Sequence, residues 1–171
     1  MLPLQGLGQG AQPIISYNYG AGNSNRVRRA YRLLLTCSVC YAMLFCLLIQ
    51  LFPGVFAAIF TSNTELLAFT KPMLRIYTLA LGLFGIQIAC QMTFTSLGNA
   101  KASIIVAVMR KFILLLPLIY IMPHLYTADL TKAVFMAEPV ADVLAVAFTG
   151  VLFFFEFRKA LRAMPKSEKR S

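Results

Sequence analysis

The sequence predicts an all-α integral membrane protein with about four full transmembrane helices, preceded by the end of another helix. Of its 171 residues, 59% are hydrophobic and 13% are charged, and the mean hydropathy is +0.73. Soluble domains carry about 25% charged residues, so this composition is typical of a membrane protein. Apolar stretches of roughly 20 residues, the length that crosses a bilayer, recur along the chain.

Residues 1–20 have the pattern of a membrane helix that lacks its beginning, because only about 15 residues precede its polar end, fewer than the roughly 20 that a spanning helix needs. Gly6 and Gly10 form a small-xxx-small pair, which predicts close packing against another membrane helix. A nucleotide-binding loop is a weak alternative for these glycines, since no predicted strand precedes them.

Four apolar spans follow the first segment. We predict them at residues 27–60, 66–98, 102–123 and 131–158, followed by a basic tail at 159–171. Pro53 should kink or end the first of these helices. The net charge of +10 lies mostly in loops and in the tail, which fits the positive-inside rule and predicts a multi-pass plasma membrane protein with a cytoplasmic C-terminus. Nucleic acid is therefore not expected as a partner.

The third span is interrupted by two cations, Arg110 and Lys111. We expect the first part of this helix to lie low in the inner interface, so that both side chains reach cytoplasmic headgroups.

The last span contains the deepest acids, Glu138 and Asp142. They are four residues apart and therefore share one helix face. A carboxylate inside a membrane is costly unless it is paired or hydrated, and two like charges favour a proton or a cation between them. The pair is thus our main candidate for substrate or ion binding. The alternatives are a hydrated Glu138 near the outer headgroups, or structural hydrogen bonds to a neighbouring helix.

Gln87 and Gln91 repeat this spacing in the second span and form a polar stripe. The stripe can line a cavity, or it can supply interhelical hydrogen bonds. The four cysteines lie in apolar segments, so we expect neither a metal site nor a cofactor. No nucleophile and base are placed together, so we expect no enzyme.

Three segments carry a family resemblance: GAQPIISYNYGA at 10–21, QMTFTSLGNAK at 91–101 and AEPVAD at 137–142. In this order they resemble the C-terminal portion of the multidrug and toxic compound extrusion (MATE) transporters. The resemblance extends over essentially the whole chain. It implies twelve helices in two lobes, with this chain supplying the end of helix eight and helices nine to twelve.

The resemblance also implies an activity. Such transporters resemble antiporters that exchange a proton or a sodium ion for cationic, amphipathic drug-like molecules. The implied partners are these compounds, the lipid bilayer and the N-terminal lobe of the same transporter. Some sodium-coupled relatives place an acid on the helix that corresponds to the second span, which here has none between Glu65 and Gly98.

Two alternatives remain at the sequence level. In the first, the chain is a truncated, non-transporting membrane piece or an assembly partner, because half of a two-lobed carrier forms no central cavity alone. Otherwise it belongs to a related carrier of lipid-linked sugars, which should have a more cationic cavity. The deep charges here are acidic, which favours cationic cargo.

Overall fold

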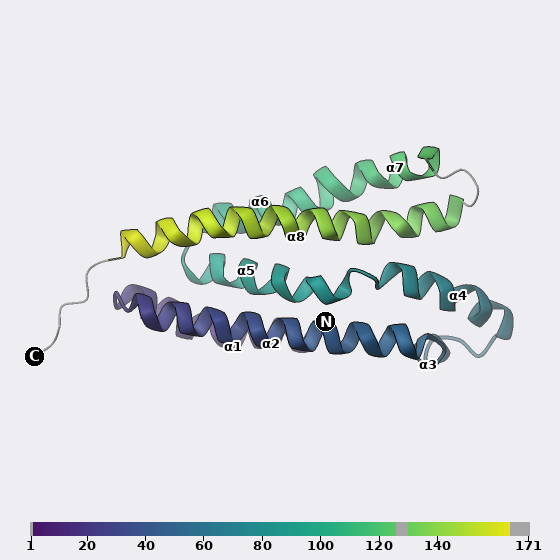
Figure 1. Ribbon diagram of the computed structural model, residues 1–171, viewed down its shortest axis with the longest axis horizontal. Helices are drawn as coiled ribbons and strands as arrows, with labels where there is room; N and C mark the ends of the chain where they lie inside the picture. Colours follow the sequence, from purple (N-terminus) through teal and green to yellow (C-terminus); the bar gives the residue numbers. More distant parts are fainter. Residues whose placement is uncertain (1, 126–129, 165–171) are drawn as a thin grey trace, which may run out of the picture.

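The computed structural model describes residues 2–125 and 130–164, and these residues form a bundle of helices without strands (Figure 1). The elements in chain order are α1 (Leu2–Gly20), α2 (Ser24–Leu51), α3 (Pro53–Ala58), α4 (Thr64–Tyr77), the 3-10 turn η1 (Leu81–Leu83), α5 (Phe84–Ser96), α6 (Ala100–Val108), the π-helical segment η2 (Met109–Leu115), α7 (Leu116–Leu125) and α8 (Leu130–Ala163).

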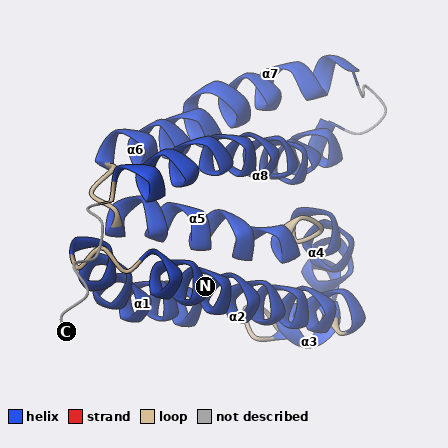
Figure 2. Ribbon diagram, turned by 60° about the vertical axis from the view of Figure 1, so that its left-hand side comes forward, coloured by secondary structure: helices blue, strands red, loops and turns tan. Residues whose placement is uncertain are grey.

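The helices form three layers, which Figure 2 shows most clearly. Helices α1 to α3 make one outer layer, α4 and α5 make the middle layer, and α6 to α8 make the other outer layer. Helix α5 packs against α1 and α2 on one side and against α8 on the other. Its residues Ala89 and Phe94 are fully buried. The middle helix therefore supplies much of the core.

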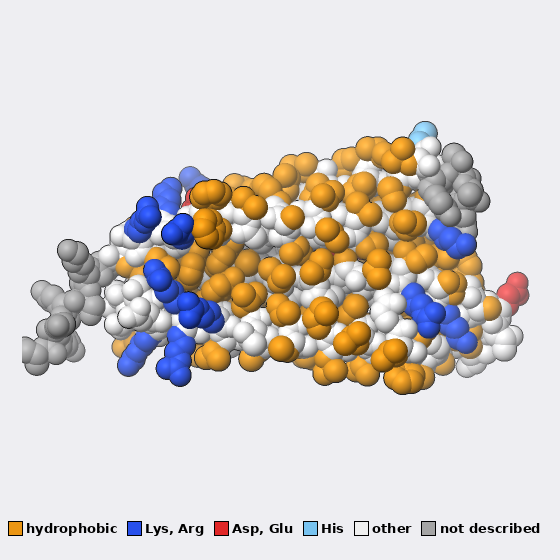
Figure 3. All heavy atoms as spheres, viewed as in Figure 1, with side chains coloured by type: hydrophobic (Ala, Val, Ile, Leu, Met, Phe, Trp, Pro, Cys, Tyr) orange, Lys and Arg blue, Asp and Glu red, His pale blue; other side chains and the backbone are white. Residues whose placement is uncertain are grey.

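The membrane-spanning prediction is confirmed in its main features. Three helical stretches are long and apolar enough to cross a bilayer, namely Ser24–Leu51, Ala100–Leu125 and Thr131–Ala163. A fourth candidate is the pair Thr64–Tyr77 and Leu81–Ser96, which is bent by 42° at its break. On the visible face, hydrophobic side chains cover the middle of the molecule, and Lys and Arg gather at its two ends (Figure 3).

The helix breaks follow local chemistry. Helix α2 ends at Leu51 and α3 begins at Pro53, because a proline is tolerated in the first turn of a helix but not in its interior. Asn63 caps α4, since its side-chain oxygen accepts hydrogen bonds from the backbone N–H groups of Glu65 (2.9 Å) and Leu66 (3.4 Å). Such caps satisfy donors that a helix leaves free at its start.

Close helix contacts depend on glycines other than the predicted pair. A Cβ atom on Gly85 would lie 2.5 Å from the backbone oxygen of Ser38, so α5 approaches α2 at backbone distance. A Cβ on Gly8 would lie 2.6 Å from the side chain of Met92. Within the described residues, nothing lies within 4 Å of such an atom on Gly6 or Gly10. Packing by Gly6 and Gly10 stays a prediction for a helix outside this chain.

Candidate functional site

Three charged side chains meet between η2 and α8. The Arg110 Nε donates a hydrogen bond to Asp142 Oδ1 at 2.7 Å. A second guanidinium nitrogen, Nη2, lies 3.4 Å from Glu138 Oε1. The guanidinium also lies over the Phe84 ring, 4.6 Å from its centroid. We call Arg110, Glu138 and Asp142 the charge cluster.

The backbone explains why these groups meet. Glu138 and Asp142 are one turn apart on α8 and present their carboxylates on the same face. Arg110 lies in η2, where the helix widens to the π-helical form. Single π-helical turns within α-helices are frequent at functional sites. Phe84 is the first residue of α5, directly after the break at η1, so the bend in the middle layer brings its ring to the guanidinium.

The charge cluster is largely withdrawn from solvent. The exposed fractions of the side chains are 17% for Arg110, 22% for Glu138 and 10% for Asp142. Asp142 lies about 18 Å along α8 from its first described residue, at 1.5 Å per residue. Uncompensated charges at such a depth are costly, so carboxylate and guanidinium stabilise one another. Two carboxylates against one guanidinium leave a formal charge of −1.

A small cavity of about 150 Å³ opens beside the charge cluster. Glu138 lines it together with apolar and aromatic side chains of α4, η2, α7 and α8, including Tyr77 and Phe135. These two rings are in edge contact, with their centroids 6.3 Å apart. Glu138 is therefore the carboxylate of the cluster that a small solute in this cavity meets first.

The predicted glutamines separate into two environments. Gln87 is buried, and its Oε1 accepts a hydrogen bond from Thr149 Oγ1 of α8 at 3.0 Å. Gln91 is half-buried, and its backbone oxygen accepts a hydrogen bond from Thr95 Oγ1 at 3.1 Å. The structure thus gives Gln87 an interhelical partner, and it does not bring either glutamine to the charge cluster through a hydrogen bond between described residues.

The expectation that Arg110 reaches cytoplasmic headgroups is wrong, because its guanidinium contacts Asp142 and Glu138 instead. The sequence did contain a signal for this pairing. Arg110 lies fifteen residues before the end of α7, and Asp142 lies twelve residues after the start of α8. Consecutive helices that run antiparallel bring such positions to similar depth, and opposite charges in a membrane interior pair with one another.

Among the described residues, no three His, Cys, Asp or Glu side chains group together, so these residues offer no ligand set for a metal ion. Cys37, Cys40, Cys46 and Cys90 are all free thiols. The buried Cys90 sulfur lies 3.7 Å from the Tyr31 hydroxyl, which joins α5 to α2.

The family follows from a direct comparison. The family model MatE matches residues 1–121, which is well over half of the chain. The chain belongs to the MatE family. This match includes the first two segments on which the resemblance was based, and the two acids of α8 lie beyond it. Among curated proteins, none matches the chain.

Solved MATE structures share the fold. A structure of the MATE multidrug transporter DinF-BH in complex with R6G is 31% identical, with a TM-score of 0.84, and covers 95% of this chain. An inward-facing multidrug resistance MATE family transporter of the MOP superfamily is 18% identical with a TM-score of 0.86, again over 95% of the chain. A mutant of the Vibrio cholerae MATE transporter VcmN is 21% identical, with a TM-score of 0.79 over 89%. This chain spans 34% to 37% of the length of these proteins.

Proposed function

We propose that this chain is part of the C-terminal lobe of a multidrug efflux transporter, which exports cationic, amphipathic compounds by proton- or sodium-coupled antiport across the plasma membrane. Membership of the MatE family supports the transport class. The likeness to the multidrug transporter DinF-BH, which was solved in complex with R6G, supports drug-like cargo. The observation that carries the ion-coupling part is the buried charge cluster, with its formal excess of one negative charge.

The two carboxylates have different roles in this proposal. Asp142 accepts the short hydrogen bond from Arg110 and is the more buried of the two, so it holds the guanidinium in place. Glu138 contacts Arg110 at 3.4 Å, which is longer than a typical hydrogen bond to a charged group. It also lines the small cavity. Glu138 therefore takes the coupling proton or sodium ion, and Asp142 and Arg110 position it.

The coupling follows from charge balance. A proton or a monovalent cation at Glu138 brings the formal charge of the cluster to zero, and its release restores the excess negative charge. A charge in a membrane interior is costly. The neutral, ion-bound cluster and the charged, ion-free cluster therefore favour different exposure to water. A change in helix packing between η2 and α8 then links ion binding to the alternating opening of the carrier.

The test is dye efflux by the polypeptide that carries this chain, in membranes with an imposed pH or sodium gradient. Glu138→Gln should abolish the dependence of efflux on the gradient while membrane insertion stays intact. Asp142→Asn should reduce efflux as well, because Arg110 loses its main partner. Glu65→Gln is the matched control, since Glu65 is an exposed acid in the first turn of α4. Unchanged gradient dependence in Glu138→Gln would remove this residue from the coupling step.

A further inference from the structure

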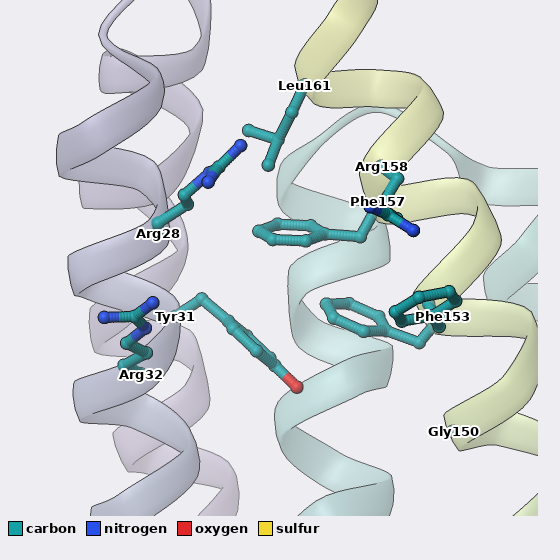
Figure 4. A pocket seen from close by; sticks show the side chains of 9 residues that line it. Arg28, Tyr31, Arg32, Gly150, Phe153, Phe157, Arg158 and Leu161 are labelled. Atoms are coloured by element: carbon teal, nitrogen blue, oxygen red, sulfur yellow. The ribbon is translucent and has the colours of Figure 1, made fainter.

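A larger cavity, of about 480 Å³, lies between α2 and α8, far along α8 from the charge cluster. Three arginines line it: Arg28 and Arg32 from the start of α2, and Arg158 from the last turns of α8. Figure 4 shows Arg28 extending from α2 toward Leu161 of α8. The positive-inside rule predicts that this end of the bundle faces the cytoplasm.

The three arginines have no anionic partner in the described part of the chain. The ion pairs between described residues both belong to Arg110. The nearest acid along α8 is Glu156, and its carboxylate accepts a hydrogen bond from Asn99 Nδ2 at 2.9 Å. Arg158 instead lies over the Phe154 ring, 4.8 Å from its centroid. The cavity therefore carries an uncompensated positive charge.

Aromatic rings form the wall between the two helices. Tyr31 stacks on Phe153 with centroids 4.6 Å apart, and Phe153 stacks on Phe157 at 4.8 Å. Figure 4 shows these rings between α2 and α8, below and beside the arginines. The site thus combines guanidinium groups with a flat apolar surface.

A second cavity, of about 560 Å³, adjoins the first along α8. The two share Phe154 and Arg158, and the second adds the cations Lys159 and Arg162. Phe155 also lines it and is 65% exposed. Cationic and apolar side chains therefore line both of these adjoining cavities, which we together call the basic groove.

We propose that this groove is a binding site for an anionic phospholipid. A phosphate oxygen accepts hydrogen bonds from the forked guanidinium groups, and an acyl chain lies against the aromatic wall and the exposed apolar face of α8. Basic pockets between membrane helices on the cytoplasmic side bind anionic lipid headgroups. The positive charge also repels cationic cargo, so this groove is distinct from the proposed transport route. The inference is independent of the ion-coupling proposal.

Native mass spectrometry of the purified polypeptide in detergent, titrated with phosphatidylglycerol or phosphatidylcholine, measures the site directly. The unchanged protein should retain phosphatidylglycerol more strongly than phosphatidylcholine. The triple variant Arg28→Gln, Arg32→Gln and Arg158→Gln should lose roughly tenfold or more of its apparent affinity for phosphatidylglycerol.

The matched control removes the same charge elsewhere at this end. Arg26, Arg29 and Lys101 are exposed and do not line the cavity. The triple variant Arg26→Gln, Arg29→Gln and Lys101→Gln should therefore stay within a few-fold of the unchanged protein. Equal losses in the two triple variants would overturn the site, because binding would then depend on overall charge alone.

A cavity-filling variant tests the same site without removing any charge. Gly150 lines the cavity, and nothing described lies within 4 Å of a Cβ built on it. Leucine favours a helix more than glycine does, so Gly150→Leu should fold at least as well and should weaken phosphatidylglycerol binding. Unweakened binding in this variant would overturn the proposal, as would equal affinity for glycerol phosphate, which has no acyl chain.

Discussion

Arginine has two different environments in this molecule, at opposite depths of the bundle. In the charge cluster, Arg110 is largely buried and contacts Asp142 at 2.7 Å. In the basic groove, Arg28 and Arg32 are exposed and have no carboxylate partner among the described residues. Burial therefore decides the role of each arginine. A buried guanidinium needs anions from its own chain, whereas an exposed one is free to bind an anion from outside.

We expect the largest change in stability from substitution of the buried Arg110. Arg110→Gln leaves two carboxylates facing each other without compensation, and we expect a loss of roughly 3–5 kcal/mol in the free energy of unfolding. Thermal unfolding of the detergent-purified polypeptide measures it. Adding Glu138→Gln and Asp142→Asn should recover most of the loss. Lys101→Gln is the control. Lys101 is an exposed cation near the start of the same helical stretch, so its substitution should change the free energy of unfolding little. A loss that these additional substitutions leave uncorrected would argue against charge compensation.

We expect a smaller loss of stability at the close contact between α5 and α2, which involves no charges. Gly85→Ala places a methyl group 2.5 Å from the backbone oxygen of Ser38, so α5 must move away from α2. Overpacking of this kind costs about 1–3 kcal/mol. Gly10→Ala is the matched control, because its added atom meets open space within the described chain. Equal melting temperatures for the two variants would contradict the close contact.

The smallest effect is expected at the uncharged polar pair that joins α5 to α8. Gln87 accepts a hydrogen bond from Thr149 at 3.0 Å, and such bonds between membrane helices contribute about 0.6 kcal/mol on average. A double-mutant cycle with Gln87→Leu and Thr149→Val should return a coupling of that size. Thr93→Val is the control, since the Thr93 hydroxyl donates its hydrogen bond to the Ala89 backbone oxygen within its own helix. A coupling of zero would mean that the bond adds no stability.

The fold was predictable from the sequence because long apolar stretches and basic loops leave few arrangements for a chain of this composition. The break at Pro53 was also predictable, since proline removes a backbone donor and fixes the local geometry. The acids of α8 were found because acids in apolar segments are rare. Their partner was not, because Arg110 was interpreted together with its neighbour Lys111 as interfacial.

Which residues pair between two helices depends on how the helices are shifted and rotated against each other. The composition of the segments does not determine this. Arg110 lies in the π-helical segment η2, and no local motif predicted that segment. The close contact of Gly85 with Ser38 was missed for the same reason. Glycine spacing in the first segment pointed to Gly6 and Gly10, whereas the observed contact depends on which residues face each other across α2 and α5.

A double-mutant cycle between Arg110 and Asp142 tests the charge cluster most directly. The free energy of unfolding is measured for the unchanged polypeptide, Arg110→Gln, Asp142→Asn and the double variant. If the guanidinium and the carboxylate bind each other in the membrane interior, the double variant should lose less stability than the sum of the two single losses, by about 2 kcal/mol or more. Additive losses, and hence a coupling near zero, would contradict the charge cluster.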